Sequence, residues 1–217
     1  TGATNTAVGD NASRLNETGV DNTAVGRSAL YSNQTDRNTA VGLEAGYTTT
    51  GADNVYVGYY AGKGGSGAET KNIGIGSSAL VSITSGADNV AIGANAGDAI
   101  TTESHTILIG RNAGGALSHT DANGAVAIGD HSLSALTSGE KNVAIGFESM
   151  LYMTDGDNNT VVGHTAFRTA DNGESDNVVI GRAAGHSINH ASSDQNVIIG
   201  SAAGTGGAAA FQSNIAI

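Results

Sequence analysis

The chain has 217 residues, of which 33 are Gly and none is Pro, Cys or Trp. The lack of Cys excludes a disulfide framework, a zinc–thiolate site and a cysteine nucleophile. The formal net charge of -11 argues against nucleic-acid and anionic-membrane partners, because both bind basic patches. No run of about 18 apolar residues occurs, so we expect no membrane insertion.

A five-residue word recurs along the chain: Asn, then Thr, Val or Ile, then usually a small residue, then Val or Ile, then Gly. Thr106 and Ala125 replace the Asn in two copies. The copies begin at Asn5, Asn22, Asn38, Asn54, Asn72, Asn89, Thr106, Ala125, Asn142, Asn159, Asn177, Asn196 and Asn214. A repeat of about 17 residues predicts a single all-β solenoid over residues 1–217, with one coil per word. The last word stops before its Gly, so we expect a fragment of a longer fibre.

Each coil is expected to contain two short strands and two turns. The fourth position of the word is Val or Ile in every copy, as at Val8 and Ile92, and this predicts the interior side of the strand. The middle position is mostly Ala, as at Ala24 and Ala91, and faces the opposite side. A strand that is apolar on both sides is buried on both, so the middle position is expected to meet another subunit. The alternative is that loops of the same chain cover it.

The Asn is expected at the corner before each strand, where its amide bonds local backbone and pairs with the Asn one coil away. Nine asparagines are predicted to form this structural ladder: Asn22, Asn38, Asn54, Asn72, Asn89, Asn142, Asn159, Asn177 and Asn196.

Two forms of the word carry a resemblance to known families. The sequence Asn-Val-Ala-Ile-Gly, at 89–93 and 142–146, resembles the repeat in the heads of YadA-like trimeric autotransporter adhesins. The longer form at 22–30, Asn-Thr-Ala-Val-Gly-Arg-Ser-Ala-Leu, resembles repeats of bacteriophage tail fibres. The resemblance covers essentially the whole chain. It implies a left-handed parallel β-roll of about 13 short coils assembled as a homotrimer, although the period is longer here than in the adhesin head.

Candidate sites for metals are few. His186 and His190 are four residues apart, a spacing that suits metal on a helix, but no third ligand is evident and a polar loop surface is the alternative. The segment 155–159, Asp-Gly-Asp-Asn-Asn, offers alternating oxygen atoms for calcium. An Asx turn at the corner of a coil is the alternative that we favour, so no cofactor is expected.

The aromatic residues are scarce, so their positions matter. Tyr56, Tyr59 and Tyr60 cluster in one coil and are candidate glycan contacts, because exposed tyrosine rings stack on sugars. The alternative is that they cover the edge of the core. No nucleophile–base–acid grouping stands out, so we expect no enzymatic activity.

These patterns predict an extracellular structural and attachment module, as in a tail fibre on a virion, that binds itself as a homotrimer and a host receptor or glycan. The runner-up is a bacterial adhesin head on the cell surface that binds host matrix or cells. A polysaccharide-degrading spike and an ice-binding solenoid are weaker alternatives. The ice-binding alternative needs an unbroken Thr ladder, whereas Val and Ile interrupt the column of Thr6, Thr23, Thr39 and Thr160.

Overall fold

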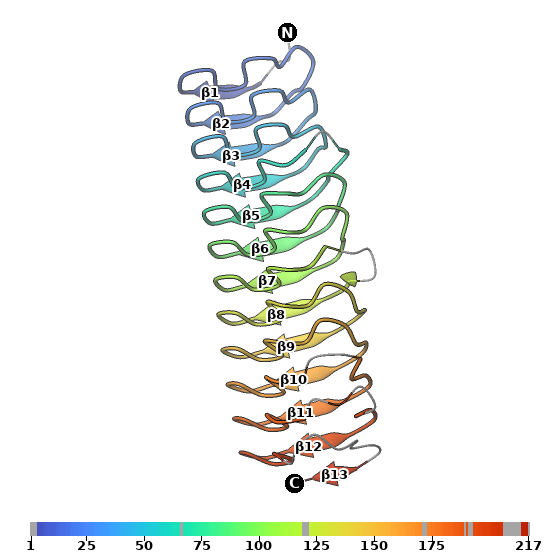
Figure 1. Ribbon diagram of the computed structural model, residues 1–217. Helices are drawn as coiled ribbons and strands as arrows, with labels where there is room; N and C mark the ends of the chain where they lie inside the picture. The colour runs from blue at the N-terminus through green and yellow to red at the C-terminus, as the bar shows by residue number, and fades with distance from the viewer. Residues whose placement is uncertain are drawn as a thin grey trace.

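The computed structural model describes residues 4–65, 67–118, 122–170, 173–188, 190, 193–205 and 214–216. Ile217, the fourth position of the last word, lies outside these ranges. The described residues form an all-β solenoid with a single sheet of thirteen parallel strands in chain order. Figure 1 shows the strands stacked in one column, with the two termini at opposite ends of the stack.

Each strand coincides with positions two to four of one word, except the last, which covers positions two and three. The strands are β1 (Thr6–Val8), β2 (Thr23–Val25), β3 (Thr39–Val41), β4 (Val55–Val57), β5 (Ile73–Ile75), β6 (Val90–Ile92), β7 (Ile107–Ile109), β8 (Val126–Ile128), β9 (Val143–Ile145), β10 (Thr160–Val162), β11 (Val178–Ile180), β12 (Val197–Ile199) and β13 (Ile215–Ala216). Equivalent positions of consecutive words pair, as Ala91 pairs with Leu108. The predicted parallel solenoid and its register are therefore confirmed.

The prediction of a second strand in every coil is wrong for the described residues. Outside the thirteen strands, the described pairing is one isolated bridge between Thr70 and Ala87. The rest of each coil turns repeatedly through left-handed backbone, as at Ser78 (φ 57) and Asp88 (φ 58). Such corners prevent an extended strand and cost non-glycine residues of the order of 1 kcal/mol each.

Hydrogen bonds between neighbouring coils offset the strain of these corners. The Ser78 N–H donates to the Tyr59 carbonyl at 2.8 Å, and the Asp88 N–H donates to the Thr70 carbonyl at 3.1 Å. The same bonds recur one coil after another, so the turns are laddered like the strands. Because backbone groups of the turns bond across coils, the corners are as regular as the sheet.

The side of the strand that lies in the core differs from the prediction. The middle residues, such as Ala24, Ala91 and Leu108, are fully buried, whereas Ile75 and Ile92 at the fourth position are each 37% exposed. The turns fold back over the middle residues and cover them with Ala45, Ala96 and their equivalents. The middle position is therefore the interior side of the coil, and the β-branched residues point outward. The described loops of the chain do not cover this outward side of the sheet.

Large and small side chains of the strands and turns fit together in the interior of the solenoid. Leu108 of β7 lies against Gly97 and Gly114, where an added Cβ would be 2.7 Å from a Leu108 methyl carbon in each case. In the coil of β5 the strand carries Gly74 and the turn supplies the buried Leu80, whereas in the coil of β7 the strand carries Leu108 and the turn carries Gly114. Other coils differ: both places are small in the coil of β6 (Ala91 and Gly97), and both are filled in the coil of β10 (Val161 and Phe167).

Candidate functional site

The outward side of the sheet is the largest distinctive surface of the chain, and we call it the apolar face. It consists of the second and fourth positions of the thirteen words. Among the described residues these positions hold twenty-one Val or Ile and four Thr. Ile73, Ile107 and Ile180 are 36%, 40% and 38% exposed, so the exposure extends along the sheet.

The size of the apolar face is unusual for the surface of a monomer. Thirteen strands at a spacing of about 4.8 Å and three residues in width give roughly 58 Å by 10 Å, or about 600 Å² in flat projection. This is at the upper end of the largest apolar patches of monomeric proteins, which are commonly interaction sites. It approaches the ~800 Å² that each partner buries in a stable interface.

The asparagines predicted as a ladder connect each coil to the next by two bonds. The side-chain oxygen of Asn38 accepts the backbone N–H of Asn54 at 2.9 Å, and its Nδ2 donates to the Gly51 carbonyl at 2.9 Å. Asn89 bonds in the same way to the Thr106 N–H and to the Glu103 carbonyl. The nine predicted asparagines are all buried. Their amides are therefore structural, and they are not presented to a ligand.

A second ladder, which the sequence reading did not identify, runs two residues before the Asn column. The Asp36 carboxylate accepts the Val20 N–H at 2.9 Å, and the Asn123 side chain accepts the Ser104 N–H at 2.6 Å. Short side chains with an oxygen acceptor, Asp, Asn and Ser, recur at this position, and that recurrence was the available signal. Several acidic residues therefore hydrogen-bond one coil to the next.

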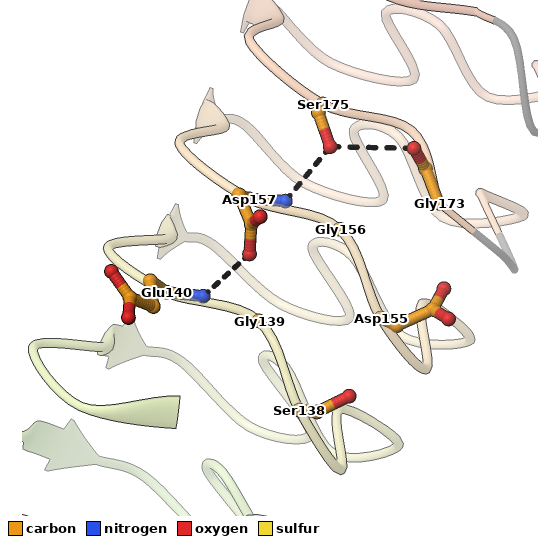
Figure 2. Close-up of a pocket in the computed structure, with 8 residues that line it drawn as sticks. All are labelled: Ser138, Gly139, Glu140, Asp155, Gly156, Asp157, Gly173 and Ser175. Carbon is orange, nitrogen blue, oxygen red and sulfur yellow. Dashed lines mark hydrogen bonds between the residues drawn. The ribbon is translucent and has the colours of Figure 1, made fainter. Parts of the chain in front are cut away.

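This ladder borders the segment in which calcium was considered. An open hollow of about 370 Å³ is lined by Gly139, Glu140, Gly156 and Asp157, among others, and Figure 2 shows how its lining residues lie. The Asp157 carboxylate accepts the Glu140 N–H at 2.8 Å, and the Asp157 N–H donates to the Ser175 hydroxyl at 3.0 Å. The carboxylate of Asp155 points away from these bonds. Asp157 is therefore used to join coils.

The described histidines that approach a carboxylate do so singly: His105 lies 3.9 Å from Asp88, and His131 lies 3.9 Å from Asp130. His186 lies in a turn, where the helical spacing that suits a metal pair with His190 does not apply. Among the described residues, no group of three or more His, Asp or Glu is placed to hold a metal ion.

Tyr56 is wrongly predicted as a glycan contact, because its side chain is fully buried in the coil of β4. Gly62 and Gly74 leave room for the ring: an added Cβ would meet it at 2.2 and 3.0 Å. Tyr59 and Tyr60 do reach the surface, and their rings stack with centroids 3.9 Å apart. The sequence placed the three tyrosines in one coil but did not distinguish a strand residue that points inward from two turn residues that point outward.

Three buried glutamates were also missed: Glu69, Glu103 and Glu174 each lie three residues before the start of a word. Glu69 is 1% exposed and occupies the column that Gly holds in several other coils. One of its oxygens accepts the Thr50 N–H at 3.2 Å, and burial raises the pKa of the carboxyl to about 7. The fully buried Tyr56 lies near enough for Glu69 to raise the pKa of its hydroxyl further. The carboxyl is therefore partly protonated at neutral pH.

The described residues contain no helix that is long and apolar enough to cross a membrane. Comparison of the chain with protein-family models, curated proteins and solved structures found no match.

Proposed function

We propose that this chain is a non-enzymatic structural and attachment module, in which three copies associate through the apolar face to form a fibre segment. The observation that carries the proposal is the double row of exposed and half-buried Val and Ile, interrupted by four Thr, along β1–β13. Water contact along such a row is unfavourable by roughly 25 cal/mol for each Å² that association would bury. A second copy has a matching row of the same length, so the face is complementary to itself.

The number three and the fibre setting rest on the resemblance to tail-fibre and adhesin-head repeats. In that setting the coils act as a stiff spacer, and the turns on the far side from the apolar face meet the host surface. Three identical chains present every turn three times, which strengthens attachment by avidity. A bacterial adhesin head uses the same assembly and differs in its source and its host target.

The assembly is tested by comparing masses in solution. Light scattering at micromolar concentration is expected to give three chains per particle for the wild type. The double variant Ile75→Asp, Ile92→Asp introduces two charges on the apolar face of adjacent coils and is expected to be monomeric. The control Ser77→Asp, Ala94→Asp adds the same charge to exposed turn positions of the same coils and is expected to remain trimeric.

The exposed positions of Ile75 and Ile92 make the test clean, because a charge there does not enter the interior of the coil. Circular dichroism is expected to show the same strand content in all three proteins. A wild type that is monomeric at micromolar concentration would contradict the proposal, and a stable dimer would contradict the number three. Attachment is tested separately by the binding of labelled wild-type protein to a panel of whole bacterial cells.

A further inference from the structure

The two edges of the apolar face carry opposite charges in two of the coils. The residue just before the word, where the strand begins, is Asp21 in the coil of β2 and Asp176 in the coil of β11. The residue just after the Gly of the same words, where the strand ends, is Arg27 and Arg182 respectively. All four residues are exposed. Each of these coils therefore has an acidic edge and a basic edge on either side of its Val and Ile side chains.

The two arginines lack ionic partners within the described part of the chain. Arg27 and Arg182 form no ion pair there, whereas five of the other seven Lys and Arg side chains do. Arg111, in the same column, lies 2.8 Å from Asp130 of the next coil. The acidic residue of the same coil is out of reach, because β11 holds Asp176 and Arg182 at opposite ends of one strand. Both guanidinium groups are therefore available to a partner outside the chain.

Three copies around a common axis bring the two edges together. All strands of the chain run in one direction, as Figure 1 shows. When each copy turns its apolar face toward the axis, three-fold rotation makes the strands of one level run in the same sense around it. The end of one strand then meets the beginning of the same strand in the next copy. Arg182 of one copy thereby faces Asp176 of the next at three junctions, and Arg27 faces Asp21 in the same way.

The width of the apolar face fits three copies better than four. A word of five residues at about 3.4 Å each spans about 17 Å, and a triangle with sides of this length has its centre about 5 Å from each side. That distance is half of the ~10 Å between packed sheets, so the Val and Ile side chains of three faces fill the triangle. A square of the same width has its centre about 8 Å from each side, which would leave a channel.

We propose that salt bridges between copies, Asp176 to Arg182 and Asp21 to Arg27, close the ring of three chains and hold the chains parallel. The inference rests on the proposed trimer and adds the residues that fix its orientation. In the twelve complete words, the parallel arrangement opposes no two carboxylates and no two Lys or Arg side chains. Complementary charges of this kind select one orientation of an interface that apolar contacts alone would leave open.

An antiparallel arrangement matches the charges less well. With all thirteen coils overlapped, it would pair like edges and place the first coil of one copy against the last coil of the other. Arg37 would then meet Asp176, but Lys71 would face Lys141 and Arg111 would face its own equivalent. Like charges that are brought together oppose association, so the edges favour the parallel orientation.

The coil of β11 allows a clean exchange of charges. Arg37 occupies the same column as Asp176, with left-handed backbone at φ 55 against φ 58, so an arginine fits the backbone there. Asp130 occupies the same column as Arg182, so an aspartate fits that position as well. Both exchanged positions are exposed, and neither new side chain enters the interior.

The test is the concentration at which half of the trimers dissociate, measured by light scattering at about 50 mM salt, because higher salt screens exposed charges. Arg182→Asp is expected to raise this concentration about tenfold, since three attractions in each trimer become three repulsions. Asp176→Arg should act in the same way, and the double variant Asp176→Arg, Arg182→Asp should restore association. Arg14→Asp makes the same change of charge outside the words and is expected to leave association unchanged.

The monomeric variant Ile75→Asp, Ile92→Asp shows whether the effect lies between copies. In that background Arg182→Asp is expected to leave the urea midpoint unchanged, because no neighbouring copy is present. A lower midpoint there would overturn the proposal, since Arg182 would then act within its own chain.

The outcomes separate the salt bridges from the assembly itself. A wild-type trimer that responds to Arg182→Asp no more than to Arg14→Asp overturns the salt bridges and leaves the fibre. A double variant that remains as weak as the single variants does the same. A monomeric wild type contradicts the fibre and, with it, the salt bridges.

Discussion

The side-chain oxygen of Asn54 accepts the backbone N–H of Asn72 at 3.0 Å, so one amide fixes the corner of the following coil. The same bond repeats along the column as far as Asn89, whose side-chain oxygen accepts the Thr106 N–H; Thr106 and Ala125 themselves have no amide to offer. An Asn at position 125 would reach the Asn142 N–H and the Gly139 carbonyl. In the part of the chain that the structure describes, no side chain bonds to either group.

Restoring the missing rung should stabilise the rod. Ala125→Asn is expected to raise the free energy of unfolding by about 1 kcal/mol, the usual net contribution of a hydrogen bond between buried groups. Urea denaturation followed by circular dichroism measures the change. The reference variant is Asn142→Ala, which removes an existing rung and should lower the midpoint. A lower midpoint for Ala125→Asn would show that the column cannot accept an amide there.

Removing an intact rung should be costly. Asn54→Ala leaves the Asn72 N–H and the Glu69 carbonyl without the amide that now bonds them at 3.0 Å each. Buried groups that lose their partner cost roughly 1–3 kcal/mol each, so for two groups we expect a loss of about 2–6 kcal/mol in urea denaturation. Glu17→Ala, at an exposed side chain, is the control and should change stability by less than about 0.5 kcal/mol.

The Gly at the end of a strand should not tolerate a side chain. Gly93 has φ +140, and an added Cβ would lie 2.4 Å from the Gly110 carbonyl oxygen of the next coil. Gly93→Ala is expected to lower the thermal midpoint strongly, with a loss of at least about 2 kcal/mol. Gly115→Ala is the matched control, since its nearest contact is 3.4 Å, and it should be nearly neutral. Equal midpoints for the two variants would refute the close stacking of coils.

Glu69 should make stability depend on pH. Burial raises the pKa of its carboxyl from 4.5 to about 7, so the folded chain binds more protons than the unfolded chain between these values. Stability should therefore fall as pH rises from about 4.5 to 7 and then level off, by an amount of the order of 3 kcal/mol. Glu69→Gln should remove most of this dependence and be more stable than the wild type above pH 7. Urea midpoints at pH 5, 6, 7 and 8 measure it, with Glu17→Gln as the exposed control, whose profile should follow the wild type.

The spacing of the word was sufficient to place every strand and its register, because two β-branched residues, one position apart, recur in each coil and are followed by Gly in every complete word. The orientation of the strand was not readable. Ile92 and Ala91 are both apolar, and the constancy of Val and Ile suggested an interior that the structure assigns to Ala. The large core residues of the turns were missed as well. Leu80 and Gly97 occupy the same column, so the alternation of large and small hides the column's role.

Functional residues could be predicted from the sequence where one residue type recurs in the same role, and not where the direction of a side chain decides the role. The Asn column was readable because one residue type recurs with one function. Tyr56 was misassigned because position within a cluster does not reveal direction, whereas its place in the middle of a strand does. Glu69 looked like one of many polar residues before an Asn, and only the coil around it shows that its carboxyl is enclosed.

The directions of the bonds between coils have a consequence for the rod as a whole. The Thr23 N–H points to Asn38 of the following coil, whereas the Gly26 N–H points back to Val8. Peptide dipoles within one coil therefore oppose each other along the axis, unlike those of an α-helix, which add up to partial charges at its ends. Adding coils therefore does not build up a net dipole along the axis of the solenoid. Coils can be added or removed in whole units at little electrostatic cost.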